Sequence, residues 1–267
     1  MNLYYLGPKG TFSHQAAQRY ITHNQATLVP QKNLFEVIQS VTTEDGSLGI
    51  VPIENSIEGT INVVADALAL NNVYAIGELR LDITFNLYGL QDSDLSEITK
   101  VYSIAPAISQ TQNFIHQHKL NYEYVDSTVA GFKFISHDVG VIAPSGSGEP
   151  LGYRSLYDNI QDYPHNITRF LVIKDELVNN KEGTQTMMLI TPQIDQPGTL
   201  ANILNTFSML NINLSWIESR PLKTQLGMYR FFVQAEMIDQ HQIDKVINIL
   251  ETLNYNIELI GRFNQLN

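Results

Sequence analysis

The chain has no cysteine, few charged residues and still fewer basic ones. Its 267 residues include 16 lysines and arginines against 27 aspartates and glutamates, which gives a net charge of −11. The lack of cysteine excludes disulfides, zinc–thiolate sites, iron–sulfur clusters and thiol nucleophiles. We expect no nucleic-acid partner, because a protein that tracks phosphates needs a face rich in lysine and arginine.

Long apolar runs and targeting signals are also missing. No stretch approaches the about 20 apolar residues that cross a bilayer, and residues 1–7 have no basic segment before their short apolar run. We therefore expect a cytoplasmic protein without membrane contact. Hydrophobic residues make up 43% of the chain, which argues against disorder and predicts a folded protein that binds small molecules.

The sequence lacks the common motifs of metal, nucleotide and serine-hydrolase sites. The seven histidines form no HExxH pair, and His116 and His118 are too closely spaced to share a helix face. The glycine-rich segment 146–152 lacks both GxGxxG and a following Lys-Ser/Thr, and no GxSxG elbow is present. We expect neither a metal nor a redox cofactor.

Short β-rich runs alternate with helical patterns over the first 175 or so residues. The expected strands are 3–6, 48–52, one or two within 74–90, 101–104, 122–125, 139–143 and 170–173. The expected helices are 14–21, 34–41, 61–70, 107–116 and 128–136. This alternation predicts a parallel or mixed sheet covered by helices.

A polar segment at residues 175–183 has no apolar periodicity and predicts a linker, with a boundary near residue 180. The elements expected after it are strand 186–191, helix 198–210, strand 213–219, strand 228–235, helix 241–253 and strand 257–263. That βαββαβ order is the ferredoxin-like motif. The sequence therefore predicts an α/β chain of two functional units, in keeping with its length.

Polar residues that suit a ligand gather at three strand-to-helix junctions, residues 7–13, 52–60 and 126–128. Ligands bind α/β sheets at such strand ends, and the N–H groups of helix N-termini attract anions. The serines and threonines of these junctions are equally explained as N-caps. Several junctions in one sheet nevertheless favour a cation-poor cleft for a small carboxylate.

Residues 163–170 form a second candidate segment. The Arg169 guanidinium can bind a carboxylate through two hydrogen bonds, and the Thr168 hydroxyl can donate to a leaving oxygen. A polar strand entry with a surface arginine explains the same pattern. In a regular strand Thr168 and Phe170 share one face and Arg169 points to the other, so all three serve one cleft only if the chain is irregular.

Together these segments resemble the prephenate dehydratase family of aromatic amino-acid biosynthesis. The matching motifs are residues 7–17 (GPKGTFSHQAA), 51–59 (VPIENSIEG), Ser127-Thr128, Thr168-Arg169-Phe170 and Glu218-Ser219-Arg220-Pro221. One segment departs from the family, because residues 103–108 read SIAPAI where members often have SHPQAL. A histidine role is therefore not carried over there, and the contacts of Ser103 and Gln110 are left open.

The resemblance implies a two-lobed catalytic domain over residues 1–178, similar to type II periplasmic-binding-protein folds. Lobe 1 would span about 1–76 and 158–178, and lobe 2 about 77–157. Residues 184–267 would form an ACT regulatory domain on the ferredoxin-like motif. Because members of the family assemble as dimers or tetramers, a homodimer or homotetramer is expected.

The reaction implied by the resemblance is the decarboxylating dehydration of prephenate to phenylpyruvate in L-phenylalanine biosynthesis. Thr168 would donate to the leaving hydroxyl, Arg169 would pair with a carboxylate and Phe170 would shape the cleft. The neutral donors would be Asn55, Ser56, Thr60, Ser127 and Thr128. Glu54 would orient its loop, take part in acid–base chemistry or form a structural ion pair.

The resemblance further implies that L-phenylalanine is an allosteric effector bound between two ACT domains. The effector residues would be Gly198, Thr199 and Leu200, in the turn 195–200, and Glu218, Ser219, Arg220 and Pro221. By pattern alone both segments are ordinary turns. Arogenate dehydratase and a non-catalytic amino-acid or solute sensor remain alternatives. Since prephenate is a dianion and the chain is acidic, we expect a closing cleft with one arginine and several neutral donors.

Overall fold

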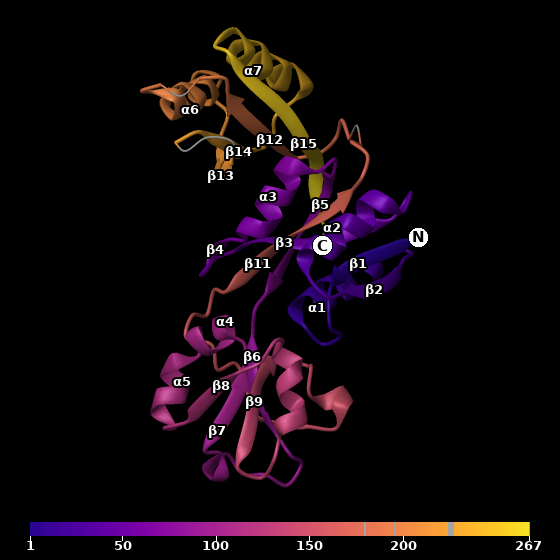
Figure 1. The fold of residues 1–267 in the computed structure, drawn as a ribbon, viewed down its shortest axis with the longest axis vertical. Coiled ribbons are helices and arrows are strands. Elements are labelled where there is room, and N and C mark those ends of the chain that lie inside the picture. Colours follow the sequence, from indigo (N-terminus) through magenta and orange to yellow (C-terminus); the bar gives the residue numbers. More distant parts are fainter. Residues whose placement is uncertain (179, 195, 224–226, 267) are drawn as a thin grey trace.

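The computed structural model describes residues 1–178, 180–194, 196–223 and 227–266. Residue 179 of the expected linker and Asp195 of the expected effector turn lie outside these ranges. Three units follow one another along the long axis of the molecule (Figure 1). A ten-stranded sheet passes through the N-terminal and the C-terminal unit. A separate five-stranded sheet forms the third unit, which lies between the other two in sequence.

The N-terminal unit carries the central part of the large sheet. Its strands are β1 (Asn2–Leu6), β2 (Thr27–Gln31), β3 (Leu48–Asn55), β4 (Gly59–Thr60), β5 (Tyr74–Asp82) and β11 (Ile167–Lys174). Its helices are α1 (Phe12–Ile21), α2 (Leu34–Thr43) and α3 (Asn62–Leu70). β1 lies parallel to β2 and β3, whereas β11 lies antiparallel between β3 and β5. The side chains of Thr11 and Asn33 accept hydrogen bonds from backbone N–H groups and so fix where α1 and α2 begin.

The second-sheet unit is inserted between β5 and β11. Its strands are β6 (Phe85–Gly89), β7 (Lys100–Ser103), β8 (Asn121–Tyr124), β9 (Val139–Pro144) and β10 (Arg154–Tyr157). Its helical segments are η1 (Leu95–Glu97), α4 (Ala105–Ser109), α5 (Gln112–Gln117), η2 (Thr128–Phe134) and η3 (Glu149–Leu151). The chain leaves the large sheet for the second-sheet unit after Asp82, because β5 pairs with β11 up to that residue and β6 pairs with β9 from Phe85 on. From the sequence, this passage was expected at about residue 77.

Two predicted helices of this unit differ from the structure. The helix expected at 107–116 is divided into α4 and α5, because the backbone of Thr111 leaves the helical conformation (φ −129°, ψ 22°). The helix expected at 128–136 is the 3-10 segment η2. It includes Gly131, a poor helix former that lets η2 pack closely on Val141 of β9.

The C-terminal unit confirms the predicted βαββαβ order. It contains β12 (Gln185–Pro192), α6 (Thr199–Met209), β13 (Leu214–Pro221), β14 (Tyr229–Glu236), α7 (Gln240–Thr252) and β15 (Tyr255–Leu266). The strands lie antiparallel in the order β13-β14-β12-β15. Both helices pack on one face of this sheet, where Phe207 and Leu250 belong to one buried cluster.

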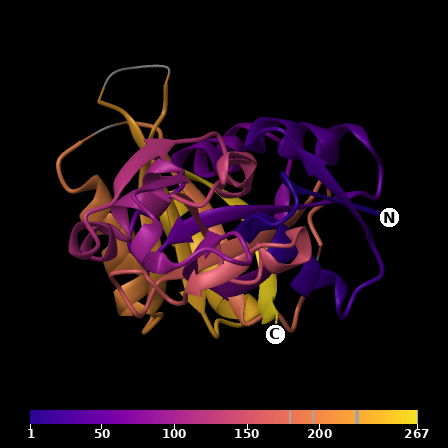
Figure 2. The same cartoon turned by 90° about the horizontal axis from the view of Figure 1, so that it is seen from below.

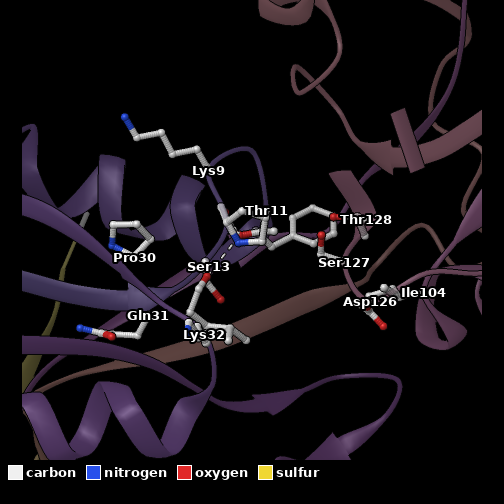
Figure 3. Close-up of a pocket in the computed structure, with 14 residues that line it drawn as sticks. Lys9, Thr11, Ser13, Pro30, Gln31, Lys32, Ile104, Asp126, Ser127 and Thr128 are labelled. Atoms are coloured by element: carbon white, nitrogen blue, oxygen red, sulfur yellow. Dashed lines mark hydrogen bonds between the residues drawn. The ribbon is translucent and has the colours of Figure 1, made fainter. Parts of the chain in front are cut away.

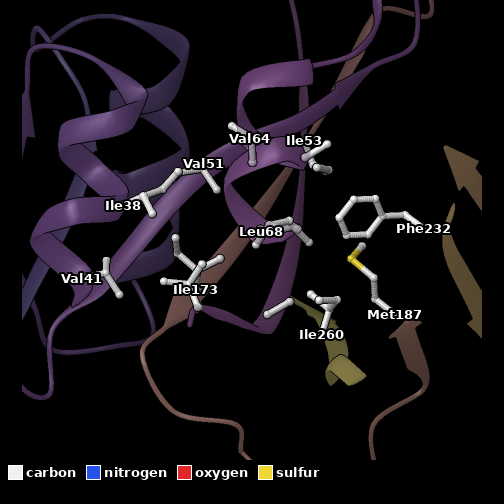
Figure 4. Close-up of a cluster of buried hydrophobic side chains, with 14 of the residues drawn as sticks. Ile38, Val41, Val51, Ile53, Val64, Leu68, Ile173, Met187, Phe232 and Ile260 are labelled. Carbon is white, nitrogen blue, oxygen red and sulfur yellow. The ribbon is translucent and has the colours of Figure 1, made fainter. Parts of the chain in front are cut away.

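The other face of this sheet packs on the N-terminal unit. Met187, Phe232 and Ile260 share a buried cluster with Leu68 of α3 and Ile53 of β3 (Figure 4). One apolar cluster thus joins β3 to the C-terminal unit.

The last strand belongs to both units. Its first part pairs with β12, and Asn264–Leu266 pair in parallel with Gly77–Leu79 of β5. Gly261 permits this passage, because a Cβ atom there would lie 2.0 Å from the Ala75 carbonyl oxygen. The chain therefore ends beside the N-terminal unit, as Figure 1 shows, and Figure 2 shows the same arrangement from below.

Candidate functional site

A cavity of 870 Å³ lies where the N-terminal unit faces the second-sheet unit. The loops after β1 and β2 line one side, and the residues after β7 and β8 line the other (Figure 3). Both strand pairs are parallel, so the carboxyl ends of two sheets meet at one cavity, the usual position of a ligand. The lining residues are Leu6, Gly7, Pro8, Lys9, Thr11, Phe12, Ser13, Pro30, Gln31, Lys32, Ile104, Asp126, Ser127 and Thr128.

Hydroxyl groups from both units face this cavity. Thr11 and Ser127 each accept a hydrogen bond from a backbone N–H group, at 3.4 and 3.2 Å, and so act as helix caps. Ser127 and Thr128, both predicted from sequence, lie in the lining. The cap interpretation and the ligand interpretation of Ser127 are therefore compatible, since a cap at a cavity wall serves both.

Two lysines supply the positive charge of the lining. Lys9 follows β1, Lys32 follows β2, and both are exposed. No ion pair among the described residues involves either of them. Figure 3 shows the Lys9 side chain extended away from Ser127 and Thr128. The sequence patterns did not single out these lysines; their position after neighbouring parallel strands is the signal that could have found them.

Thr168 lies in a different place, a buried group of neutral side chains that we call the amide cluster: Asn55, Gln110, Asn166 and Thr168. Asn55 Nδ2 donates to Thr168 Oγ1 (3.0 Å) and Asn166 Oδ1 (2.8 Å). Asn166 Nδ2 donates in turn to Gln110 Oε1 (2.6 Å). All four side chains are at most 8% exposed, so their geometry is fixed by one another.

The orientation of the Asn55 amide follows from its other bonds. Its Oδ1 accepts from the backbone N–H groups of Ile57 and Glu58, each at 2.9 Å. The amide nitrogen must then face Thr168, so the Thr168 hydroxyl receives a hydrogen bond. Among the described residues no acceptor receives a hydrogen bond from that hydroxyl.

The short helix α4 connects the amide cluster to the cavity. Ile104, just before α4, lines the cavity, and Gln110, just after it, bonds Asn166. Gln110 Nε2 also donates to Glu58 Oε1 (3.0 Å) and so joins the second-sheet unit to the N-terminal unit. Gln110, whose contacts were left open by the sequence, thus belongs to the amide cluster. Asn166 was not predicted, although its spacing of two from Thr168 suits a shared face.

Arg169 lies on the opposite side of β11 from the amide cluster. Its Nη1 donates to Glu54 (2.8 Å), and its Nη2 donates to Glu78 (3.0 Å) and to Gln234 of β14 (2.6 Å). The guanidinium also lies over the Trp216 ring, 5.7 Å from its centroid. We call Glu54, Glu78, Arg169 and Gln234 the interface cluster, because it joins the N-terminal and C-terminal units.

The structure does not bring all predicted substrate residues together. Thr60 donates to Glu218 of β13 (2.8 Å), and the Ser56 hydroxyl bonds backbone atoms of His165 and Ile167. Phe170 is fully buried among apolar side chains. Glu54 is engaged in an ion pair, one of the three roles considered for it.

The predicted effector residues form two separate groups. Gly198 caps α6 with a φ of 91°, Thr199 bonds the backbone of Gln196, and Leu200 is exposed. The other group lies on β13, where Glu218 and Arg220 face the N-terminal unit and Ser219 and Pro221 are exposed.

Arg220 of β13 contacts α3, whereas Glu218 contacts β4. Arg220 donates to Asp66 (2.9 Å) and Asn62 (2.6 Å). The hydrogen bond from Arg220 holds the pKa of Asp66 below its usual value.

Two kinds of structure are absent from the described part of the chain. None of its helices combines the length and the apolar character needed to span a membrane. No three histidine, aspartate or glutamate side chains within it gather as a metal site.

Comparison with known proteins identifies relatives that match nearly the full length. The family model described as prephenate dehydratase matches residues 3–177. A prephenate dehydratase of Bacillus subtilis (strain 168) is 34% identical over 281 residues, with 98% of each chain covered. The crystal structure of the prephenate dehydratase from Staphylococcus aureus subsp. aureus Mu50 is 61% identical, with a TM-score of 0.93 over 99% of this chain and all of that one. A prephenate dehydratase from Arthrobacter aurescens, in complex with L-Phe, is 26% identical, with a TM-score of 0.88 over 99% of this chain and 90% of that one.

Proposed function

Because the chain belongs to the prephenate dehydratase family, we propose that the amide cluster and the cavity at the other end of α4 together hold the substrate. The activity is that of a hydro-lyase, the decarboxylating dehydration of prephenate to phenylpyruvate in phenylalanine biosynthesis. The proposal concerns which residues carry out this reaction and how it is regulated.

We assign to Thr168 the O–H group that donates to the departing ring hydroxyl. In the reaction the bond between the ring and its carboxylate breaks, and its electron pair enters the ring. The carbon–oxygen bond of the ring hydroxyl breaks with it, so the dianion takes up one proton and releases carbon dioxide and water. Solvent later returns the proton to Thr168. A threonine hydroxyl is a weak acid, and this role requires a fixed position away from bulk water.

The observation that carries the assignment is the unused proton of Thr168. The oxygen is held by Asn55 Nδ2 and is 8% exposed at the residue level. A donor whose position is fixed and whose proton is uncommitted can donate to a leaving oxygen without first giving up another hydrogen bond. Asn55 thus supports Thr168, and Ser127 and Thr128 offer further neutral groups at the cavity.

We assign the binding of the substrate's negative charge to Lys9 and Lys32 rather than to Arg169. Both terminal nitrogens of Arg169 are bonded to protein groups, and a substrate carboxylate would have to displace Glu54 or Glu78. The two lysines have no carboxylate partner among the described residues and lie at the cavity. The sequence led us to expect that one arginine and several neutral donors bind the substrate carboxylates. In the present proposal two lysines take the place of the arginine.

The test is phenylpyruvate formation from prephenate by the purified chain. Arogenate dehydratase remains the alternative, and the ratio of kcat/KM for prephenate and arogenate decides between them. Tight binding of prephenate without turnover would instead favour the sensor alternative and would contradict the proposed roles.

We further propose that residues 1–178 form the catalytic domain and 184–267 an ACT regulatory domain that binds L-phenylalanine. The βαββαβ order supports this, as does the contact of Glu218 and Arg220 with the N-terminal unit. A phenylalanine complex is known for the Arthrobacter relative. Regulation requires unequal affinity for two states of the cleft. Phenylalanine that binds but changes neither turnover nor oligomeric state would contradict this proposal.

A homodimer or homotetramer in the cytoplasm completes the proposal. Exposed apolar residues on α6 and β13, namely Leu200, Leu204 and Ile217, support association through the C-terminal unit. Sedimentation equilibrium, with and without phenylalanine, would measure the assembly, and a strict monomer in both conditions would contradict it.

A further inference from the structure

We propose that Gln234, a residue of the C-terminal unit far from the cavity in sequence, is a positioning residue for Thr168 and acts through Arg169. The proposal rests on the assignment of Thr168 as the donor. It concerns the interface cluster, which lies on the opposite side of the strand pair β3–β11 from the amide cluster.

Gln234 is held on both sides of its amide. Its Oε1 accepts from Arg169 Nη2 (2.6 Å), and its Nε2 donates to Glu78 (3.1 Å) and Gln185 (2.7 Å). Gln234 is 1% exposed and Glu78 is fully buried. The amide oxygen therefore faces the guanidinium of Arg169, and the amide nitrogen faces the carboxylate of Glu78.

Arg169 receives two contacts from the C-terminal unit and two from the N-terminal unit. Gln234 and Trp216 belong to the former, and Glu54 and Glu78 to the latter. These contacts fix the direction of the guanidinium, since hydrogen bonds to charged groups are strong and directional in a buried site. Loss of the Gln234 contact removes the hydrogen bond that Arg169 makes to the C-terminal unit and leaves the contact with Trp216.

The strand register connects Arg169 to the donor. Thr168 pairs with Asn55 and Arg169 pairs with Glu54, so the two clusters use adjacent residues of the same two strands. The register shifts directly after Arg169, between Arg169 and Phe170. Such an irregularity re-aims neighbouring side chains and interrupts the ladder with β3, while the ladder with β5 stays regular at these residues. The interface cluster therefore holds the backbone at the point where Thr168 must meet Asn55.

The control is another residue of β14 that contacts the N-terminal unit without touching the interface cluster. Arg230 donates to the Ala69 carbonyl oxygen at the end of α3 (3.0 Å) and to that of Leu222 (3.3 Å), and it is 8% exposed. Its loss removes another buried contact of the same strand, so Arg230→Met reports the general effect of weakening the interface.

The experiment measures kcat, KM and melting temperature with prephenate for the wild type, Gln234→Leu, Gln234→Glu and Arg230→Met, well below every melting temperature. We expect Gln234→Leu to lower kcat by about tenfold with KM changed less than about twofold. Gln234→Glu keeps an acceptor for Arg169 but adds a carboxylate beside Glu78, so it should recover kcat while losing thermal stability. Arg230→Met should keep kcat within about twofold of the wild type.

The outcomes separate this proposal from the proposed function. A wild type without turnover of prephenate contradicts the proposed function. With an active wild type, the positioning role of Gln234 is overturned if Gln234→Leu keeps full kcat, or if kcat follows melting temperature across all variants. If Gln234→Leu does not fold, Gln234→Glu decides, because a kcat reduced in proportion to its lost stability also overturns the proposal.

Discussion

The two faces of the strand pair β3–β11 carry opposite kinds of chemistry. On one face Asn55 and Thr168 join a cluster of neutral amides and one hydroxyl, and on the other Glu54 and Arg169 join a cluster of charges. Both clusters are largely buried. The neutral cluster keeps one proton uncommitted, whereas the charged cluster uses both terminal nitrogens of its guanidinium. The proposed donor hydroxyl and the buried ion pairs of Arg169 therefore lie on opposite faces of the strand pair rather than in one site.

Alternation along a strand produces this separation. Neighbouring residues point to opposite faces, so the adjacent residues of Glu54-Asn55 and of Thr168-Arg169 are each divided between the two clusters.

The largest expected effect is at Thr168, the proposed proton donor on the neutral face. Thr168→Ala should lower kcat by about 10²- to 10⁴-fold, the usual contribution of a positioned proton donor. Its melting temperature should stay near that of the wild type, because one hydrogen bond to a neutral partner contributes only about 1 kcal/mol. Thr168→Ser keeps the hydroxyl and serves as the control; equal loss in both variants would remove the hydroxyl from the chemistry.

The next effect is on stability, at the charged face. Arg169→Gln should lower the free energy of unfolding by about 3 kcal/mol, because Glu54 and the fully buried Glu78 lose a charged partner. Glu78 keeps Arg80 as a partner (2.9 Å), which places the effect at the lower end of the range for buried pairs. The free energies of unfolding of the wild type and Arg169→Gln would be measured by urea denaturation. An unchanged midpoint would show that the charged cluster does not stabilise the contact between units.

A smaller effect is expected at the cavity, away from both faces. Lys32→Gln should raise KM for prephenate by about threefold with little change in kcat, because the proposal lets this exposed charge meet a substrate carboxylate and an exposed ion pair contributes less than about 1 kcal/mol. Lys9→Gln is the matched control, with a smaller expected effect since its side chain extends away from Ser127 and Thr128. Steady-state kinetics at low salt measures both, and an unchanged KM in both would return the anion-binding role to Arg169.

The smallest effect is a pH dependence at the second ion pair between the units. Arg220 lowers the pKa of Asp66 in the folded state, so the pair stabilises the fold above the unfolded pKa of about 4 and loses this effect as pH falls through the lower folded value. Asp66→Asn should therefore cost at most about 1 kcal/mol at pH 7. Its difference from the wild type should shrink below pH 4 in acid titrations of unfolding, and a constant difference down to pH 2 would contradict the assignment.

Local patterns predicted most of the fold. The βαββαβ order and the alternation before it were recovered, since strand and helix periodicities are local signals. β2 was missed because its residues, TLVPQ, include a proline and have no clear alternation. The extension of β15 to β5 was missed because pairing with a distant strand leaves no mark on local periodicity.

The candidate site was predicted in part. The opposed directions of Thr168 and Arg169 follow from strand alternation alone, and the structure places them accordingly. The partner of Arg169 could not be predicted, because Gln234 belongs to another unit and no motif marks it. Thr60 illustrates the same limit, since its hydroxyl reaches Glu218 across the contact between units. Lys9 and Lys32 required the strand order that brings the ends of β1 and β2 together.

The most direct test compares the two adjacent residues on opposite faces in one assay. Phenylpyruvate release from saturating prephenate would be measured for Thr168→Ala and Arg169→Lys at a temperature where both variants are folded. We expect Thr168→Ala to lose at least about a hundredfold in kcat, and Arg169→Lys to stay within about tenfold of the wild type, since a lysine keeps the charge but not the planar geometry. A hundredfold loss in Arg169→Lys beside a nearly normal Thr168→Ala would contradict the division of the site between the two faces.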